Sequence, residues 1–310
     1  MPILENYSAG KQFFALLLIL LASFFILTPF GILIAVPFID GNIFTAMGNM
    51  ELAKTPQDIA LLKYFQIISQ IAIFIASSFF FALLVNKRPL SFFTLNKSPK
   101  INLIVIAIVI GFVSSPFLNW VMELNYRLHL PSAFAFLEDW MRQMEIDATK
   151  LTEIFLSGNG WSTLLVNLLM MSVLAGLGEE LLLRGIVQPL FIRITKNAHL
   201  GIWLAAALFS LMHFQFFGFI PRMLLGALFG YYYYWSRNLW IPIIAHILNN
   251  GVIVVYAFFS GTTEIAPNMG EFNVDNNPIT LFTILSILLS VFLSIAGLWF
   301  FYSERVKDRV

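Results

Sequence analysis

The chain has 310 residues, of which 59% are hydrophobic and only 11% are charged. Its net charge of +1 excludes the basic footprint of a nucleic-acid-binding protein, and the lack of cysteine excludes disulfides, thiolate metal sites and a cysteine nucleophile. Because a soluble domain of this length needs far more polar surface, the composition predicts an all-α, polytopic membrane protein with one integral membrane domain over residues 1–310.

Eight predominantly apolar runs are candidates for membrane-spanning helices, each of which needs roughly 20 residues. In chain order they are Phe13–Phe38, Tyr64–Val85, Ile101–Met122, Trp161–Ile192, Leu200–Phe219, Met223–Trp235, Leu239–Phe259 and Ile279–Tyr302. The first run is too long for the apolar core of a signal peptide, so we expect it to be retained. The sequence therefore predicts an eight-helix bundle, whose sixth helix is short.

Charged residues sort onto the two ends of these eight helices. Lysine and arginine dominate one set of connections, including Lys87, Arg88 and Lys100, whereas acids such as Glu138 and Asp147 dominate the other set. Because short cytoplasmic loops are enriched in basic residues, this pattern places both termini in the cytoplasm. An odd number of spans would mix the two sets.

Residues 123–160 form the longest predicted segment outside the bundle. Phe134, Phe136 and Trp140 stand among acids there, which predicts an amphipathic helix on the external membrane surface. This helix could shield a site or contact a substrate, but the simpler interpretation is a packed connecting helix. The Gly261–Pro278 connection is polar and rich in turn residues, and predicts a loop.

The stretch Gly178–Gly185 places three charged side chains among apolar residues. Charges at membrane depth are costly and usually face a protein interior or a wet cavity where they have a function. Glu180 and Arg184 are four apart, with the acid first, and so can form an ion pair on one helical face. Glu179 points about 100° away and can stay free as a general base. The alternative is an ion pair that only pins two helices together.

Four histidines divide into two pairs. His129 lies in the segment outside the bundle and His199 at a helix start, so both are expected at the surface. His213 lies in the fifth predicted span and His246 in the seventh, and a histidine at membrane depth is by default a functional hypothesis. A single such histidine is more often structural than functional, whereas two beside a glutamate pair favour a site.

Counting residues from the cytoplasmic helix ends places several polar side chains at similar depths. At ~1.5 Å per residue, Glu179 and His213 both lie about 20 Å into the membrane. His246 and Asn250 lie somewhat nearer the cytoplasm. Phe209 shares a helical face with His213, as His246 does with Asn250, because each pair is four apart. The sequence thus predicts that these side chains converge in one cavity.

Together these residue types supply the groups needed to hydrolyse an amide bond. A glutamate and a histidine can hold and deprotonate a water molecule, while a second histidine and an asparagine amide can donate hydrogen bonds to the oxyanion. Glu179, His213 and His246 are also an acceptable zinc-binding set with one open position. The helical zinc-protease motif with two histidines around a glutamate does not occur in the sequence. The residues therefore leave dependence on a metal open.

At these positions the sequence resembles the CaaX protease and bacteriocin-processing family of intramembrane peptidases, whose pattern consists of three motifs on separate helices. The motifs are Glu179-Glu180 with Arg184, Phe209 with His213, and His246 with Asn250. All three occur in the family's order, and the resemblance covers residues 168–255, the predicted catalytic core. Each motif alone is weak, whereas the ordered set is specific.

The resemblance implies an eight-helix bundle whose cavity opens toward the cytoplasm. The roles it implies are general base for Glu179, its partner for His213, oxyanion donors for His246 and Asn250, and support for Glu180, Arg184 and Phe209. It favours a mechanism without a metal or other cofactor. Zinc held by Glu179, His213 and His246 is the alternative.

The resemblance also bears on substrate and location. Eukaryotic relatives remove the last three residues of prenylated proteins, whereas bacterial relatives are linked to peptide maturation, bacteriocin immunity and signalling. Because the sequence shows no organelle-targeting or retention signal, we expect a prokaryotic plasma-membrane protein, embedded in the lipid bilayer, that acts on a peptide or membrane-protein substrate. A prenylated substrate is then not expected.

Two other functions stay open from the sequence. The first is a non-enzymatic immunity or scaffold protein that keeps the fold and binds a partner in the cavity. The second is a transporter whose glutamate and histidines relay protons. The intact motifs argue against the first, because binding alone does not require both glutamates and both histidines. Transporters often have internally repeated halves, and the sequence shows no such repeat.

Overall fold

Helices make up nearly all of residues 2–35, 55–263 and 280–306, which are the residues that this computed structural model describes, and no strand occurs among them. In chain order the elements are α1 (Ala9–Ala35), α3 (Pro56–Gln70), η3 (Ile71–Ala76), α4 (Ser77–Val85), α5 (Pro89–Phe92), α6 (Ile101–Tyr126), η4 (Ser132–Phe134), α7 (Ala135–Leu156), α8 (Trp161–Asn167), η5 (Leu168–Leu174), α9 (Ala175–Leu182), η6 (Leu183–Val187), α10 (Gln188–Thr195), α11 (Ala198–Leu211), α12 (Phe219–Ser236), α13 (Trp240–Ser260) and α14 (Leu281–Val306). The predicted all-α class is confirmed.

Six helices in the described part of the chain are long and apolar enough to cross a membrane. They are Ala9–Ile34, Pro56–Val85, Ile101–Tyr126, Trp161–Thr195, Trp240–Ser260 and Leu281–Glu304. Each corresponds to a predicted span, although residues 36–38 of the first lie outside the described ranges. The second begins earlier than predicted, at Pro56, because Thr55 and Asp58 form a capping box. The chain is therefore an integral membrane protein.

The fifth and sixth predicted spans differ from the observed helices. Helix α11 has only 14 residues and ends at Leu211, so the prediction of a span reaching Phe219 was wrong. Helix α12 begins at Phe219 instead of Met223, and neither α11 nor α12 is among the six long apolar helices. The total of eight spans stays a prediction.

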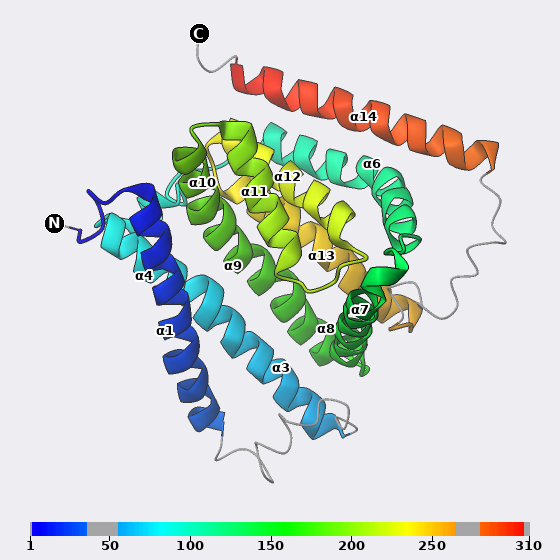
Figure 1. Ribbon diagram of the computed structural model, residues 1–310, viewed down its shortest axis with the longest axis horizontal. Helices are drawn as coiled ribbons and strands as arrows, with labels where there is room; N and C mark the ends of the chain where they lie inside the picture. Colours follow the sequence, from blue (N-terminus) through cyan, green and yellow to red (C-terminus); the bar gives the residue numbers. More distant parts are fainter. Residues whose placement is uncertain (1, 36–54, 264–279, 307–310) are drawn as a thin grey trace.

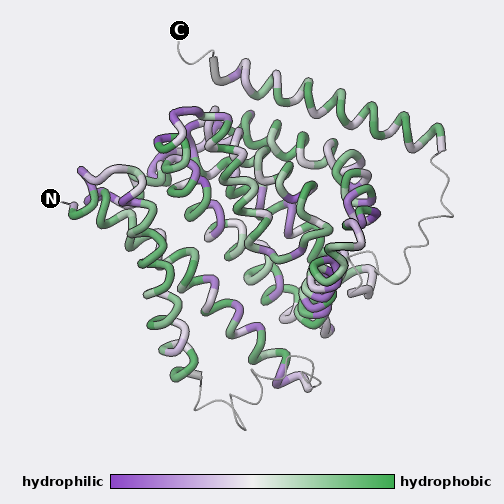
Figure 2. Tube along the Cα trace, viewed as in Figure 1, coloured by the Kyte–Doolittle hydropathy of each residue, from purple (hydrophilic) through white to green (hydrophobic). Residues whose placement is uncertain are grey.

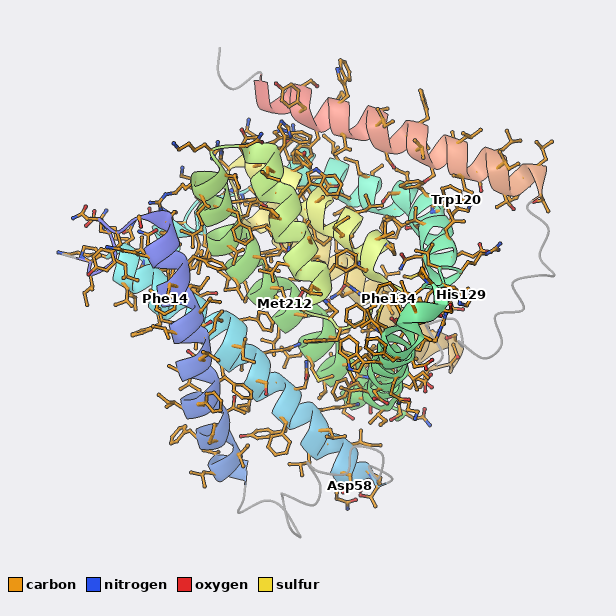
Figure 3. All side chains as sticks on the ribbon, viewed as in Figure 1. Phe14, Asp58, Trp120, His129, Phe134 and Met212 are labelled. Carbon is orange, nitrogen blue, oxygen red and sulfur yellow. The ribbon has the colours of Figure 1, made fainter. Side chains whose placement is uncertain are left out.

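The outermost helices turn apolar side chains away from the bundle. Helices α1 and α14 lie at its edges, whereas α9 to α13 occupy the middle (Figure 1). Phe14 on α1 is 62% exposed (Figure 3), and Phe292 on α14 is 67% exposed. Most residues of both helices are hydrophobic, whereas hydrophilic residues gather along α7 (Figure 2). Exposed apolar faces of this extent suit contact with lipid and not with water.

A single helix from Trp161 to Thr195 carries the glutamate pair, as predicted. Two π-helical segments, η5 and η6, flank the short α-helical segment α9 that contains both glutamates. Single π-helical turns inside α-helices occur frequently at functional sites. On α9, a Cβ added to Gly176 would lie 2.9 Å from the backbone nitrogen of Ile247. The glycine therefore lets α9 approach the backbone of α13 closely.

The segment outside the bundle is helical, as predicted, over Ala135–Leu156. Phe136 is 74% exposed and Trp140 46% exposed, whereas Glu145 is buried against the loop that follows α11. Helix α7 is thus amphipathic and also packed, and its external location stays a prediction. His129 and His199 are exposed, as expected. The Gly261–Pro278 connection lies mostly outside the described residues.

Candidate active site

Glu180 and Arg184 form the predicted ion pair in the interior of the bundle. Arg184 Nη1 lies 2.7 Å from Glu180 Oε1, and the two side chains are 1% and 0% exposed. Arg184 also donates a hydrogen bond of 2.8 Å to the carbonyl of Gly226 on α12. Its guanidinium lies 4.9 Å from the ring centre of Phe209 on α11. The pair therefore ties three helices together, and removing one partner would leave a buried charge without compensation.

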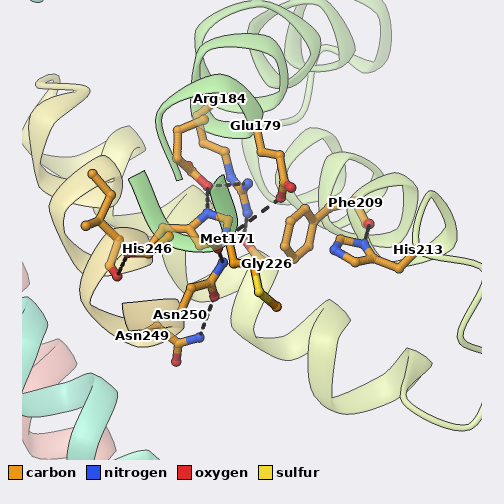
Figure 4. A network of polar contacts seen from close by, with 12 residues as sticks. Met171, Glu179, Arg184, Phe209, His213, Gly226, His246, Asn249 and Asn250 are labelled. Carbon is orange, nitrogen blue, oxygen red and sulfur yellow. Dashed lines mark hydrogen bonds and ion pairs between the residues drawn. The ribbon is translucent and has the colours of Figure 1, made fainter. Parts of the chain in front are cut away.

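His246 on α13 contacts both glutamates. Its Nδ1 lies 2.9 Å from Glu180 Oε1 and its Nε2 lies 3.8 Å from Glu179 Oε2. Figure 4 shows His246 and Glu179 in this network of polar contacts. Because an ionised carboxylate only accepts hydrogen bonds, Nδ1 is the donor to Glu180. The ring stacks on Phe229 with 5.1 Å between centroids. His246 is thus held in one orientation, with Nε2 toward Glu179.

Glu179 makes fewer polar contacts than Glu180 among the described residues. Its side chain is 13% exposed, and its buried Oε2 accepts no hydrogen bond from the described residues. Within the described ranges, no hydrogen bond or ion pair joins Glu179 to His213, the partner predicted for it. The imidazole close to Glu179 is that of His246. Glu179 therefore keeps an oxygen free to accept a proton or to hold a water molecule.

His213 lies beyond the end of α11 and not within a helix, which corrects the sequence prediction. Its Nδ1 is 2.8 Å from the carbonyl oxygen of Phe209, and the two rings are 5.0 Å apart. Because a carbonyl only accepts, Nδ1 carries the proton, and Nε2 of the neutral ring is an acceptor. The predicted proximity of Phe209 and His213 is confirmed.

Asn250 is held against the π-helical segment η5. Its Nδ2 donates to the carbonyl of Met171 at 3.1 Å, and its Oδ1 accepts from Asn249 Nδ2 at 3.2 Å. A nearby hydrogen bond of 2.6 Å from Ser172 Oγ to the carbonyl of Ile247 links the same two helices. Since a primary amide has two N–H groups, Asn250 retains one for another acceptor.

A cavity of about 450 Å³ lies between α6, α12, α13 and the end of α11. Its polar lining includes His213, Arg222, His246, Asn249 and Asn250. Both histidines and Asn250 thus converge in one cavity, as predicted. The two glutamates do not line it in the described structure, and Glu179 is connected to it through His246. The predicted opening of the cavity toward the cytoplasm stays a prediction.

Arg222 lines the cavity but is not among the site residues predicted from the sequence. Its Nη2 donates to Gln215 Oε1 at 2.7 Å and its Nη1 to the carbonyl of Gln215 at 3.3 Å. The residue lies between the fifth and sixth predicted spans, where a lone basic residue is expected in a loop. Its position only nine residues after His213, in a mostly apolar stretch, could have indicated that Arg222 belongs to the site.

The alternative zinc set of Glu179, His213 and His246 does not assemble among the described residues. Among the described residues, no group of three or more His, Asp or Glu side chains is placed to hold a metal ion. Glu179 and His246 are neighbours, but His213 is turned by its hydrogen bond to Phe209 and lacks contact with Glu179 in the described ranges. These three residues therefore do not fit zinc as they stand.

The fold and the site together define an integral membrane protein with a polar cluster buried among its helices. Residues 161–252 match the family model described as type II CAAX prenyl endopeptidase Rce1-like. The uncharacterized protein YpbD of Bacillus subtilis (strain 168) is 29% identical over 90 residues, which cover 28% of this chain and 43% of YpbD. The matched region thus spans less than half of that relative. No solved structure matches the chain.

The family match contains every residue of the three motifs. The resemblance to the CaaX protease and bacteriocin-processing family is confirmed over residues 161–252. The segments before and after these residues, including α1, α6, α7 and α14, lie outside the match.

Proposed function

We propose that the chain is an intramembrane endopeptidase that hydrolyses a peptide bond with a water molecule activated by Glu179. The observation that carries this proposal is the contact of one buried imidazole, that of His246, with two glutamates inside the region that matches the peptidase family. An ion pair that only pins helices together needs one acid, and Arg184 already pairs with Glu180. The second acid and the free oxygen of Glu179 support a chemical role.

In the proposed reaction, the free oxygen of Glu179 takes a proton from water as the water oxygen attacks the carbonyl carbon of the substrate. The carbonyl oxygen becomes an oxyanion, which accepts a hydrogen bond from Nε2–H of His246. The proposed step uses the ring with a proton on each nitrogen, so that Nδ1 donates to Glu180 and Nε2 donates to the oxyanion. The tetrahedral intermediate then expels the amine, which receives the proton from Glu179.

Asn250 and His213 complete the proposed site from the cavity side. The free N–H of Asn250 is the second donor to the oxyanion, while the carbonyl of Met171 fixes the amide group. His213 holds the attacking water through Nε2, because its Nδ1–H is already bound to Phe209. Such preorganised donors contribute most when the surrounding structure excludes bulk water.

The proposed setting follows the charge distribution and the apolar surface. The protein would lie in a prokaryotic plasma membrane with both termini in the cytoplasm and would act on a peptide or a membrane protein. None of the proposed steps uses a cofactor. A binding or immunity protein without activity is the competing function, and the experiment below separates the two.

The test compares new peptide termini in host membranes that contain wild-type protein, Glu179→Gln or Glu123→Gln at equal levels. Glu123→Gln is the matched control, because that side chain is 38% exposed and its one ion pair among the described residues is with Arg127 in the next helical turn. Termini that appear with wild type and Glu123→Gln but not with Glu179→Gln would support the peptidase and identify its substrate. If three folded proteins give the same termini, the peptidase proposal is wrong and the binding function is favoured.

A further inference from the structure

The loop that carries His213, residues 212–218 between α11 and α12, is held from the outside by α7. Glu145 Oε2 of α7 accepts a hydrogen bond of 3.1 Å from the backbone nitrogen of Phe217. Glu145 is only 1% exposed, although acids on a helix outside a bundle are normally solvated. A carboxylate that is buried against a single backbone N–H therefore has a specific structural task.

The end of α6 holds the same loop from a second side. Asn125 Nδ2 donates to the carbonyl of Phe216 at 3.2 Å and also to the carbonyl of Phe217. The hydroxyl of Tyr126 donates to Glu145 Oε1 at 3.3 Å, and its ring is parallel to that of Phe217. One donor and two acceptors of the loop backbone are thus bound by side chains far away in the sequence.

Aromatic contacts add to these hydrogen bonds. The guanidinium of Arg142 on α7 lies 4.4 Å from the ring centre of Phe217. The rings of Trp140 and Phe216 are 5.2 Å apart. Helix α7 therefore presents three residues between positions 140 and 145 to two successive residues of the loop.

The loop needs such support because its own conformation is unfavourable. Phe214 has a φ of 53°, in the left-handed region, which costs a bulky residue about 1 kcal/mol or more. His213 precedes this strained residue directly, and Phe217 lies four residues after His213. In a connection of only seven residues, a shift at Phe217 is passed on to His213.

The inner side of the loop faces the cavity. His213 and Arg222 both line it, and Gln215 joins the loop to Arg222 through two hydrogen bonds. Burial raises the pKa of Glu145, while the hydrogen bond from Phe217 and the positive charge of Arg222 act in the opposite direction. Glu145 and Arg222 therefore bond to residues of the same loop, Phe217 and Gln215.

We propose that Glu145 is a positioning residue of the active site, which holds the 212–218 loop in the shape that presents His213 and Arg222 to the cavity. Its catalytic consequence rests on the proposed peptidase function, whereas the clamping of the loop does not. Glu145 acts through the backbone of Phe217 and does not touch the reacting atoms. Helix α7, which lies outside the family match, thereby becomes part of the site.

The first test measures loop mobility without any substrate. Because the chain has no cysteine, Met212→Cys introduces a single thiol into the loop, at a side chain that is half-buried against the core. In this background, Glu145→Ala should raise the rate of labelling by a water-soluble maleimide by roughly 10-fold, because a hydrogen bond to a carboxylate is lost. Glu145→Gln should stay near the original rate, since the amide oxygen still accepts from Phe217.

Asp147→Ala is the matched control, because Asp147 lies on the same helix, is exposed and, within the described ranges, accepts a side-chain hydrogen bond from Gln143 alone. Tyr126→Phe is the milder variant if Glu145→Ala does not fold, and it should raise the labelling rate by a smaller factor. If Glu145→Ala or Tyr126→Phe is labelled at the rate of the control, Glu145 does not hold the 212–218 loop in place, whatever the activity of the protein.

The second test uses the substrate identified by its new terminus. Glu145→Ala should lower kcat by roughly 10-fold or more with little change in KM, because a misplaced His213 affects the reaction and not the binding. Glu145→Gln should restore most of the activity. Faster labelling with unchanged kcat would refute the positioning role. Faster labelling of Glu145→Ala in a chain without peptidase activity would refute the proposed function but would still support the role of Glu145 in holding the loop.

Discussion

One oxygen of Glu180 joins α9 to α13 through His246. Glu180 Oε1 accepts from His246 Nδ1 at 2.9 Å and from Arg184 Nη1 at 2.7 Å. The two donors approach the oxygen from different helices, and all three side chains are at most 3% exposed. The orientation of the imidazole toward Glu179 is therefore coupled to the same contact that neutralises the arginine.

Arg184→Met should destabilise the protein strongly. It leaves Glu180 as a buried charge with less compensation, and breaking a buried pair in this way costs about 3–5 kcal/mol. Thermal unfolding in detergent and the yield of folded protein measure the effect. Arg193→Met is the control, because Arg193 lies on the same long helix but is exposed and, in the part of the chain that the structure describes, its side chain donates to Gln12 alone. Adding Glu180→Gln to Arg184→Met should recover part of the stability, and no recovery would argue against an electrostatic cause.

Asn250→Ala should reduce turnover more than affinity. The proposed oxyanion contact forms only in the transition state, and the loss of one such donor typically costs ~10²–10³ in kcat. Asn249→Ala is the matched control, because Asn249 lines the same cavity and its side chain donates, among the described residues, to Asn250 alone. We expect a smaller loss for the control in a steady-state assay. Equal losses in kcat for both variants would contradict the proposed role of Asn250 as a donor to the oxyanion.

Gly176→Ala should separate α9 from α13. The new methyl group would lie 2.9 Å from the backbone nitrogen of Ile247 and 3.2 Å from its Cα, so backbone must move. Overpacking of this kind typically costs 1–3 kcal/mol and should also loosen the contact between Glu180 and His246. The unfolding temperature of Gly176→Ala is compared with that of Gly10→Ala, where no atom lies within 4 Å of the added carbon. Equal stability of the two variants would contradict the close approach of the helices.

Glu138 should make stability depend on pH below the ordinary carboxylate range. Hydrogen bonds from Arg142, from the backbone of Leu130 and from His129 lower the pKa of Glu138 from 4.5 to about 2. A lowered pKa means that the contribution to stability is complete above pH 4.5 and is lost as the pH falls toward 2. The difference in unfolding temperature between wild type and Glu138→Gln should therefore shrink over this interval. A difference that is constant with pH would show that the charge of Glu138 is not involved.

Contacts within one helix could be predicted from the sequence. The spacing of Glu180 and Arg184 predicted their ion pair, and the predominantly apolar character of residues 161–192 predicted one long helix around them. Counting residues along their helices also predicted the membrane depths of Glu179, His246 and Asn250, and these depths stay a prediction. Depth alone does not determine which faces meet, so the contact of His246 with both glutamates could not be predicted.

The end of α11 shows why other features were missed. The stretch from Leu200 to Phe217 contains no proline and no glycine after Gly201, so local propensity favours a continuing helix. The chain turns at residues 212–214 instead, where Glu145 and Asn125 bind the following backbone from 72 and 92 residues away. Tertiary hydrogen bonds of this range leave no trace in the local sequence.

The net charge of the buried cluster depends on how many protons its side chains carry. Glu179, Glu180, Arg184 and His246 together hold two acids, one permanent cation and one imidazole, so the cluster is electrically neutral only when it carries one additional proton. With the His246 ring protonated on both nitrogens, as the proposed reaction requires, the cluster is already neutral, and the proton that Glu179 takes from water offsets the negative charge that forms on the oxyanion. The proposed hydrolysis therefore adds no net charge to the apolar interior of the bundle.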